Sequence, residues 1–98
     1  MVRLSVHLLA VKEYDAAFAW YARRSVNVAA RFRDEVNAAI GRISASPSSG
    51  PALTSKDRFV RVRRYPYILI YRIFPDQSMA VLAVAHTARR PGYWKRRS

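Results

Sequence analysis

The sequence predicts an α+β fold in which a helical hairpin packs on a small, mostly antiparallel sheet, in the order β-α-α-β-β-β. Two observations predict this class. Apolar residues recur every three or four positions between residues 11 and 44, and elsewhere they alternate or form short unbroken runs. A segment that stops helix formation separates the helical part of the sequence from the strands after it, and it is Ser46-Pro47-Ser48-Ser49-Gly50-Pro51. We expect one domain over residues 1–98, because 98 residues suffice for a single core.

The first strand and the first helix are expected between residues 2 and 24. Residues 2–9 alternate in polarity, which predicts a strand with one buried face and with His7 on the solvent side. The residues of the buried face are Val2, Leu4, Val6 and Leu8. From about residue 11 to residue 24 the spacing is helical. The apolar stripe of that helix consists of Val11, Tyr14, Phe18 and Tyr21.

A second helix and three strands complete the predicted fold. Ser25 or Asn27 can cap a helix that runs to about Ser44, and the short connection favours antiparallel packing of the two helices. After a loop that continues to about Asp57, the strands are expected at Phe59 to Arg64, Tyr67 to Phe74 and Met79 to His86. The strand from Tyr67 is almost wholly apolar, which indicates a central position. Residues 75–78 form a hairpin turn, and residues 87–98 form a basic tail.

The charge of the chain indicates an anionic partner. Lys and Arg number 18 against 6 Asp and Glu, which gives a net charge of +12, and 15 of the 18 are Arg. Residues 51–98 hold 11 basic and 2 acidic side chains, whereas residues 1–50 hold 7 and 4. Such an excess suits nucleic acid, an anionic membrane or an acidic protein, and Arg suits phosphate and carboxylate especially well.

Other sequence features bear on the compartment and on cofactors. There is no cysteine, which excludes disulfides and thiolate metal sites and is typical of a cytoplasmic protein. No apolar stretch is long enough to span a bilayer, and residues 4–11 lack a cleavage site of the signal-peptide kind. We therefore expect a cytoplasmic protein that has no membrane partner, no cofactor and no metal.

Several motifs, taken in order, resemble the RelE/ParE superfamily of toxins, which are also known as plasmid stabilisation proteins. The first is Ala30-Arg31-Phe32 through Ile40 and Ile43, followed by Pro47. The second is Arg63-Arg64-Tyr65-Pro66-Tyr67-Ile68-Leu69-Ile70-Tyr71-Arg72. The third is Val81-Leu82-Ala83-Val84-Ala85-His86, followed by Arg89-Arg90-Pro91-Gly92-Tyr93-Trp94. The resemblance covers residues 14–97, and its motifs are specific for the superfamily only in combination.

The resemblance implies the toxin half of a type II toxin–antitoxin system. Such a toxin inhibits growth until a cognate antitoxin binds it in a hetero-oligomer, with a helix along the helical hairpin and a strand at a sheet edge. ParE-like members poison DNA gyrase, and RelE-like members enter the ribosomal A site and cut messenger RNA. The resemblance also suggests that the hairpin borders the antitoxin site, for which the candidate residues are Tyr14, Phe18, Phe32, Val36 and Arg72.

The RelE-like alternative would make the protein an endoribonuclease, and RNA cleavage needs a base, a cation and an acid. The candidate catalytic residues are His86, Arg61, Arg63, Arg89 and Tyr93. No glutamate follows Glu35, so carboxylates near the sheet are limited to Asp57 and Asp76. Each candidate also has a structural interpretation as a packing or solvated residue. Because this catalytic set is incomplete, the sequence favours the ParE-like gyrase poison, which needs only a complementary surface.

A third alternative is a small basic nucleic-acid-binding module. Its motivation is the mixture of aromatic residues and arginines on the predicted strands, which suits single-stranded RNA. The sequence has neither an RNP-like aromatic pair nor a glycine-rich clamp.

Overall fold

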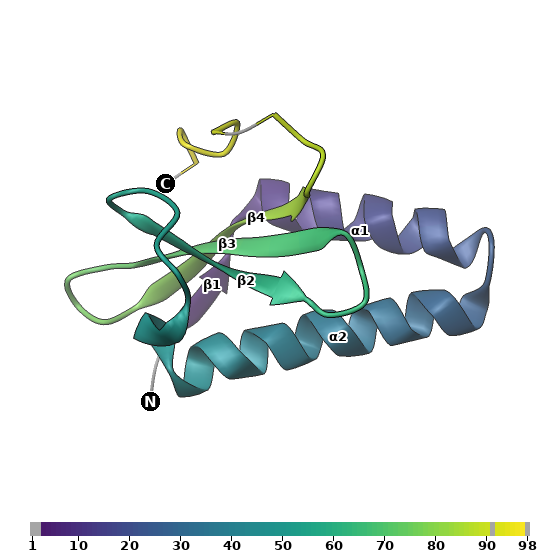
Figure 1. Ribbon diagram of the computed structural model, residues 1–98, viewed down its shortest axis with the longest axis horizontal. Coiled ribbons are helices and arrows are strands. Elements are labelled where there is room, and N and C mark those ends of the chain that lie inside the picture. Colours follow the sequence, from purple (N-terminus) through teal and green to yellow (C-terminus); the bar gives the residue numbers. More distant parts are fainter. Residues whose placement is uncertain (1–2, 91, 98) are drawn as a thin grey trace.

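The computed structural model describes residues 3–90 and 92–97 and confirms the predicted α+β class and element order. The elements are β1 (Leu4–Val6), α1 (Leu8–Ala22), α2 (Val26–Ala45), the short 3-10 helix η1 (Pro47–Ser49), β2 (Asp57–Val62), β3 (Tyr67–Ile73) and β4 (Met79–His86). The two helices form an antiparallel pair on one side of the sheet, and the C-terminal tail lies on the other side (Figure 1). No helix among the described residues is both long and apolar enough to cross a membrane.

The sheet has four strands in the order β1-β4-β3-β2. β2 and β3 are antiparallel, as are β3 and β4, whereas β1 runs parallel to β4 and pairs only with Met79–Val81. The prediction that the strand from Tyr67 is central is therefore correct. β4 is also central, and all of its residues except His86 are buried.

The N-terminal prediction is wrong in its boundary. β1 ends at Val6, and α1 begins at Leu8. The cause is His7, whose Nδ1 accepts a hydrogen bond from the Leu9 N–H at 3.1 Å and so caps the helix. Leu8 is consequently 64% exposed on the helix and does not belong to a buried strand face. Val2, predicted for the same face, lies outside the described residues.

The helical hairpin matches its prediction more closely. Ser25 caps α2, since its Oγ accepts a hydrogen bond from the Val28 N–H at 3.2 Å. One stripe of α2 is buried against the sheet, and it consists of Ala29, Phe32, Val36, Ala39 and Ile43. In α1 the buried residues are Ala10 and Ala17, whereas Val11 is 38% exposed and leaves the predicted stripe.

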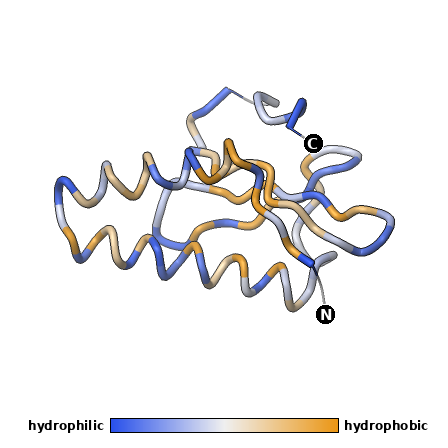
Figure 2. The backbone as a smooth tube through the Cα atoms, turned by 180° about the vertical axis from the view of Figure 1, so that it is seen from behind, coloured by the Kyte–Doolittle hydropathy of each residue, from blue (hydrophilic) through white to orange (hydrophobic). Residues whose placement is uncertain are grey.

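Both faces of the sheet are covered. The core between helices and sheet centres on Phe32 and Leu69, and Trp94 of the tail packs on the opposite face with Ile70 and Leu82. Figure 2 shows the hydrophobic colour gathered in the central strands and alternating along α2. A bulge interrupts β4, because Ile70 pairs with Ala83 and Tyr71 pairs with Val81. Leu82 is the extra residue, and it therefore faces the tail.

Candidate functional site

A groove of about 520 Å³ lies between α1, the start of β3 and the end of β4. Its polar and aromatic lining consists of Glu13, Trp20 and Tyr21 from α1 together with Tyr67, His86 and Arg89. Two of the predicted catalytic residues, His86 and Arg89, are thus brought together in it. Glu13 adds a carboxylate from α1, whereas the sequence led us to expect only Asp57 and Asp76 near the sheet.

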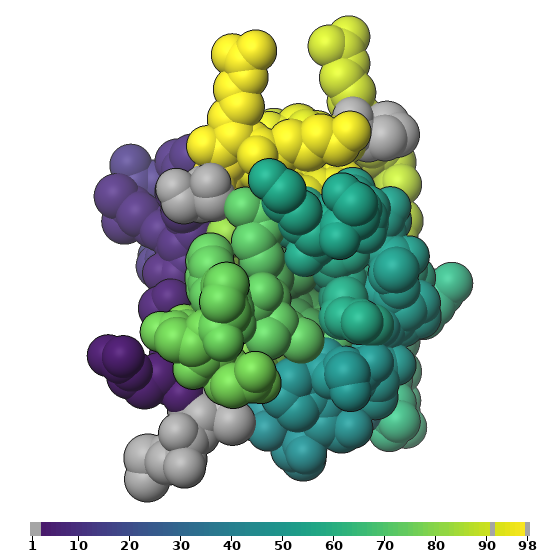
Figure 3. Space-filling view, turned by 90° about the vertical axis from the view of Figure 1, so that its left-hand side faces the viewer, coloured from purple at the N-terminus to yellow at the C-terminus, as the bar shows by residue number. Residues whose placement is uncertain are grey.

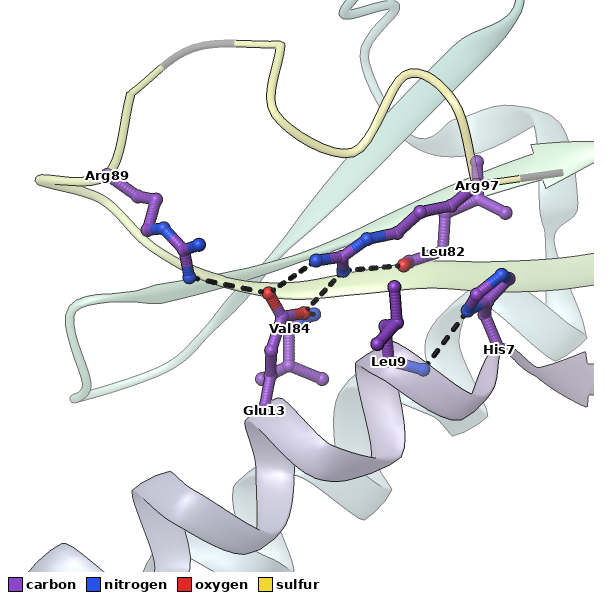
Figure 4. Close-up of polar contacts among 7 residues, drawn as sticks. All are labelled: His7, Leu9, Glu13, Leu82, Val84, Arg89 and Arg97. Carbon is purple, nitrogen blue, oxygen red and sulfur yellow. Dashed lines mark hydrogen bonds and ion pairs between the residues drawn. The ribbon is translucent and has the colours of Figure 1, made fainter.

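Glu13 covers an edge of β4 that has no neighbouring strand within the described residues. β1 pairs with β4 only as far as Val81, so the backbone beyond the bulge would be unpaired. The Glu13 carboxylate accepts a hydrogen bond from the Val84 N–H at 3.0 Å, and Arg97 donates to the Leu82 carbonyl at 3.2 Å (Figure 4). Two side chains therefore occupy the place of a strand, which protects the edge from unwanted pairing.

An ion pair between Glu13 and Arg97 fastens the tail to α1. Arg97 donates from Nη1 to Oε1 at 2.8 Å and from Nη2 to Oε2 at 3.1 Å, which is a bidentate arrangement. Both side chains are mostly buried, with 12% and 14% exposure. Arg89 is a weaker partner, because its Nη1 lies 3.6 Å from Oε2 and its side chain is 54% exposed.

Replacing Arg97 with alanine is expected to loosen the tail. Hydrogen bonds to charged groups contribute about 1.5–3 kcal/mol, so we expect the free energy of unfolding to fall by about that amount. The Val84 amide should also exchange its hydrogen faster. Arg96→Ala is the matched control, because Arg96 is exposed, and its effect should stay within about 0.5 kcal/mol. Equal effects of the two substitutions would contradict the role of the ion pair.

His86 is positioned to donate a hydrogen bond from Nε2 into the groove. Its Nδ1 accepts a hydrogen bond from the Ala88 N–H at 3.0 Å, so the neutral ring carries its proton on Nε2. The ring also packs edge-on against Tyr67, with 5.1 Å between the ring centroids. His86 can thus donate a hydrogen bond into the groove while its other nitrogen holds the turn after β4.

Tyr93 is poorly suited to proton transfer. Its hydroxyl is buried and has no hydrogen-bond partner among the described residues. Burial, and after it the neighbouring Glu13 carboxylate, raise the pKa of Tyr93 well above its ordinary value of 10.0. The guanidinium groups of Arg89 and Arg97 lie 4.1 Å and 4.9 Å from the centre of its ring. The residue therefore serves as a platform on which the two arginines stack.

Arg61 and Arg63 lie away from this groove. Together with Arg42 they line a separate pocket of about 370 Å³ beside the edge strand β2. Across the strands, Arg61 pairs with Ile68, and Ile68 pairs with Ala85. Arg61 is therefore aligned with Ala85, the residue just before His86 on β4. β2 and β4 are two strand spacings apart, which is about 10 Å.

The same register places Arg61 and His86 on opposite faces of the sheet. Directly paired residues of antiparallel strands project from the same face. Arg61 therefore shares the face of Ile68, under the tail, whereas His86 shares the face of Tyr67, under the helices. The predicted catalytic residues do not converge on one reacting atom, and Glu13 is already engaged by an N–H and two arginines.

The predicted partner-binding residues are also dispersed. Phe32 is fully buried and Val36 is 5% exposed, so both belong to the core and offer no side-chain surface to a partner. Tyr14 and Phe18 are half-buried and stack on each other with 6.1 Å between ring centroids. Arg72 lies on the far side of the sheet from the helices, on the face that the tail covers.

Several large apolar side chains are exposed, although the periodicity of the sequence predicted some of them to be buried. At the start of α1 and the end of β1 they are Val6, Leu8, Leu9 and Val11, and around the turn between the helices they are Trp20, Val26 and Val28. Such residues lie outside the buried stripe. The signal in the sequence is that α1 carries apolar side chains on all sides, which is typical of a helix with two packing partners.

Asp57 and Arg72 form a second ion pair, on the sheet face that the tail covers. Arg72 donates from Nε to Asp57 Oδ1 at 2.7 Å, and Trp94 donates from Nε1 to Oδ2 at 3.1 Å. Asp57 is 2% exposed, so the pair anchors Trp94 from beneath. This carboxylate is occupied on both oxygens and is not available as a base.

Within the described residues, no three His, Asp or Glu side chains gather as metal ligands would.

The chain is similar to a known protein family and to a solved structure. A family model described as the ParE toxin of type II toxin-antitoxin system, parDE, matches residues 4–91. A solved structure titled "Chromosomal ParDE TA system from P. aeruginosa" is similar to this chain with a TM-score of 0.73 and 15% sequence identity, over 88% of this chain and 96% of that chain. At that identity the likeness shows the shared fold. No curated protein sequence matches the chain.

Proposed function

This chain belongs to the ParE family of toxins of type II toxin–antitoxin systems, and on that basis we propose that it inhibits growth by binding DNA gyrase and that a cognate antitoxin neutralises it. The family membership implies an antitoxin partner. Gyrase as the target is our proposal, and it rests on the resemblance to ParE-like gyrase poisons.

The observation that supports this choice over RNA cleavage is that the candidate catalytic residues do not all surround one point. His86 and Arg61 project from opposite faces, and the Tyr93 hydroxyl is buried. A nuclease needs its acid, its base and its cation around one phosphate. A toxin that acts by binding needs only a surface of matching shape and charge.

We propose that the antitoxin covers the outward face of the helical hairpin. The exposed apolar side chains of α1, from Leu8 to Trp20, would supply the buried centre of that interface. The net charge of +12 favours a partner with an acidic surface. The partner contacts of Tyr14 and Phe18 would be through the edges of their half-buried rings.

The decisive experiment runs two assays on the same purified protein. We expect that it inhibits supercoiling by DNA gyrase, that it leaves ribosome-bound messenger RNA intact, and that added antitoxin reverses the inhibition. Expression of the toxin alone should arrest growth, and co-expression of the antitoxin gene should restore it.

The assays also define the result that would overturn the proposal. Cleavage of the message that His86→Ala or Arg61→Ala abolishes would assign the protein to the RelE-like nucleases. Harmless expression of the folded protein would contradict a toxin of either kind.

A further inference from the structure

Two adjoining pockets flank Arg72 at the end of the sheet where β2 begins and β3 ends. They measure about 580 Å³ and 320 Å³, and both are lined by Ser55, Lys56 and Arg72. Arg58 and Phe74 also line the larger pocket, and Thr54 and Lys95 the smaller one. Figure 3 looks onto this end of the molecule, where the tail, the loop before β2 and the β3–β4 hairpin meet.

The pockets are strongly cationic. Four basic side chains line them, and the acid among the lining residues is Asp57, which is almost fully buried. Both Asp57 oxygens are engaged, one by Arg72 and the other by Trp94. Asp57 thus neutralises one charge from below. The Arg58 guanidinium donates to the Ser48 and Gly50 carbonyls and keeps its charge, and Lys56 and Lys95 supply two further charges.

Arg72 is held in a fixed orientation. Its Nε donates to Asp57, which Trp94 holds from the other side, and the Arg72 side chain is only 14% exposed. Its two Nη groups make no hydrogen bond within the described residues, and neither is fully enclosed. A guanidinium that is already immobilised loses little side-chain entropy when an anion binds, and its remaining N–H groups match phosphate oxygens.

We infer that this end of the sheet binds the phosphodiester backbone of a nucleic acid, with Arg72 between two successive phosphates. Adjoining cationic pockets around one fixed guanidinium suit a ligand whose charge repeats. The larger pocket also has an apolar wall of Ile73, Phe74 and Pro75. The charge of the lining is what favours a nucleic acid, because protein–nucleic acid interfaces are much more positively charged than protein–protein interfaces. The exposed large apolar residues lie on β1, on α1 and at the start of α2, with Leu53 the exception near this end.

The test compares two double variants that remove the same charge. Lys56→Ala with Lys95→Ala removes two of the four basic side chains that line the pockets. Lys12→Ala with Arg31→Ala removes two exposed charges from the helices. Binding of a short labelled DNA duplex is measured by fluorescence anisotropy at several salt concentrations. A duplex RNA of the same sequence shows whether either nucleic acid is preferred, and thermal unfolding shows that both variants are folded.

We expect the pocket variant to bind roughly tenfold more weakly at low salt, with the slope of log K against log salt reduced by about 2, because each phosphate contact contributes about 0.9 to that slope. The helix variant should keep the slope of the unmodified protein. Equal losses of affinity in the two variants would show that the duplex is held only by diffuse attraction to the net charge. A poly-glutamate chain that competes as well as a duplex of equal charge would show a carboxylate site instead. Either result, or no salt-dependent binding at all, overturns the inference.

Because naked duplexes are used, this test is independent of the supercoiling assay. A protein that binds duplex through the pockets but does not inhibit gyrase would contradict the proposed target only. A protein that inhibits gyrase but does not bind duplex would contradict only the phosphodiester site.

Discussion

Replacing Asp57 with alanine is expected to lower the free energy of unfolding by about 3–5 kcal/mol, which is the usual loss when one partner of a buried ion pair is removed. Asp57 is 2% exposed and Arg72 is 14% exposed. Without the carboxylate, Arg72 would keep a poorly solvated charge, and the Trp94 N–H would lose its acceptor. Urea unfolding, followed by the fluorescence of the tryptophans, measures the loss.

The same residue predicts a dependence on pH. Burial by itself would raise the pKa of Asp57, but hydrogen bonds from Arg72 and Trp94 outweigh burial and hold the pKa below its ordinary value of 3.8. The ionised carboxylate therefore stabilises the fold above that value, and its contribution is lost as the pH falls through the lower pKa of the folded state. The stability difference between the unmodified protein and Asp57→Asn should shrink as the pH falls below about 4.

Asp34→Ala is the control for the Asp57 experiment. Asp34 forms its ion pair with Arg33 on the surface, with side chains 69% and 51% exposed, and such pairs contribute about 0–1 kcal/mol. A loss at Asp57 no larger than the loss at Asp34 would show that the buried pair does not hold the tail.

Phe32→Ala is expected to cost about 3–5 kcal/mol of stability, as truncation of a buried phenylalanine usually does. Phe32 is fully buried at the centre of an aromatic cluster. Its ring centroid lies 5.1 Å from that of Tyr65, 5.2 Å from that of Tyr21 and 5.4 Å from that of Tyr67. The ring therefore joins α2 to α1 and to the turn that precedes β3. Thermal or urea unfolding of the isolated protein measures the effect.

Phe18→Ala provides a matched aromatic control, because Phe18 is only half-buried on α1. Its substitution should cost clearly less, since less apolar area leaves water when Phe18 packs. If Phe32→Ala left the isolated protein unchanged and weakened only antitoxin binding, Phe32 would be a partner contact, and its place in the core would be contradicted.

The elements that were predicted correctly are those whose neighbours along the chain determine them. In α2, a capping serine, an apolar stripe and a proline-containing stop act within a few residues of one another. β1 was misplaced because residues 2–9 alternate in polarity as a strand would, whereas the imidazole of His7 caps a helix at that point. Alternation alone does not distinguish the two outcomes when the segment is so short.

The candidate site was predicted only in part. His86 and Arg89 lie in one groove, but Glu13 and Arg97, which organise it, are 84 positions apart and carry no local signal. The sequence also left open whether Arg61 could join His86. The sheet register places Arg61 and His86 on opposite faces, and a shift by one residue would reverse the face to which a side chain points.

Periodicity, capping and composition were enough to predict the fold class, the helical hairpin, the central strands and the strong positive charge, because these signals act locally or need no geometry. The tertiary structure decided which charges meet: Glu13 with Arg97, Asp57 with Arg72, and the two cationic pockets around Arg72. Those pairings depend on strand order, on the bulge at Leu82 and on the path of the tail, which are set when separate segments pack against each other.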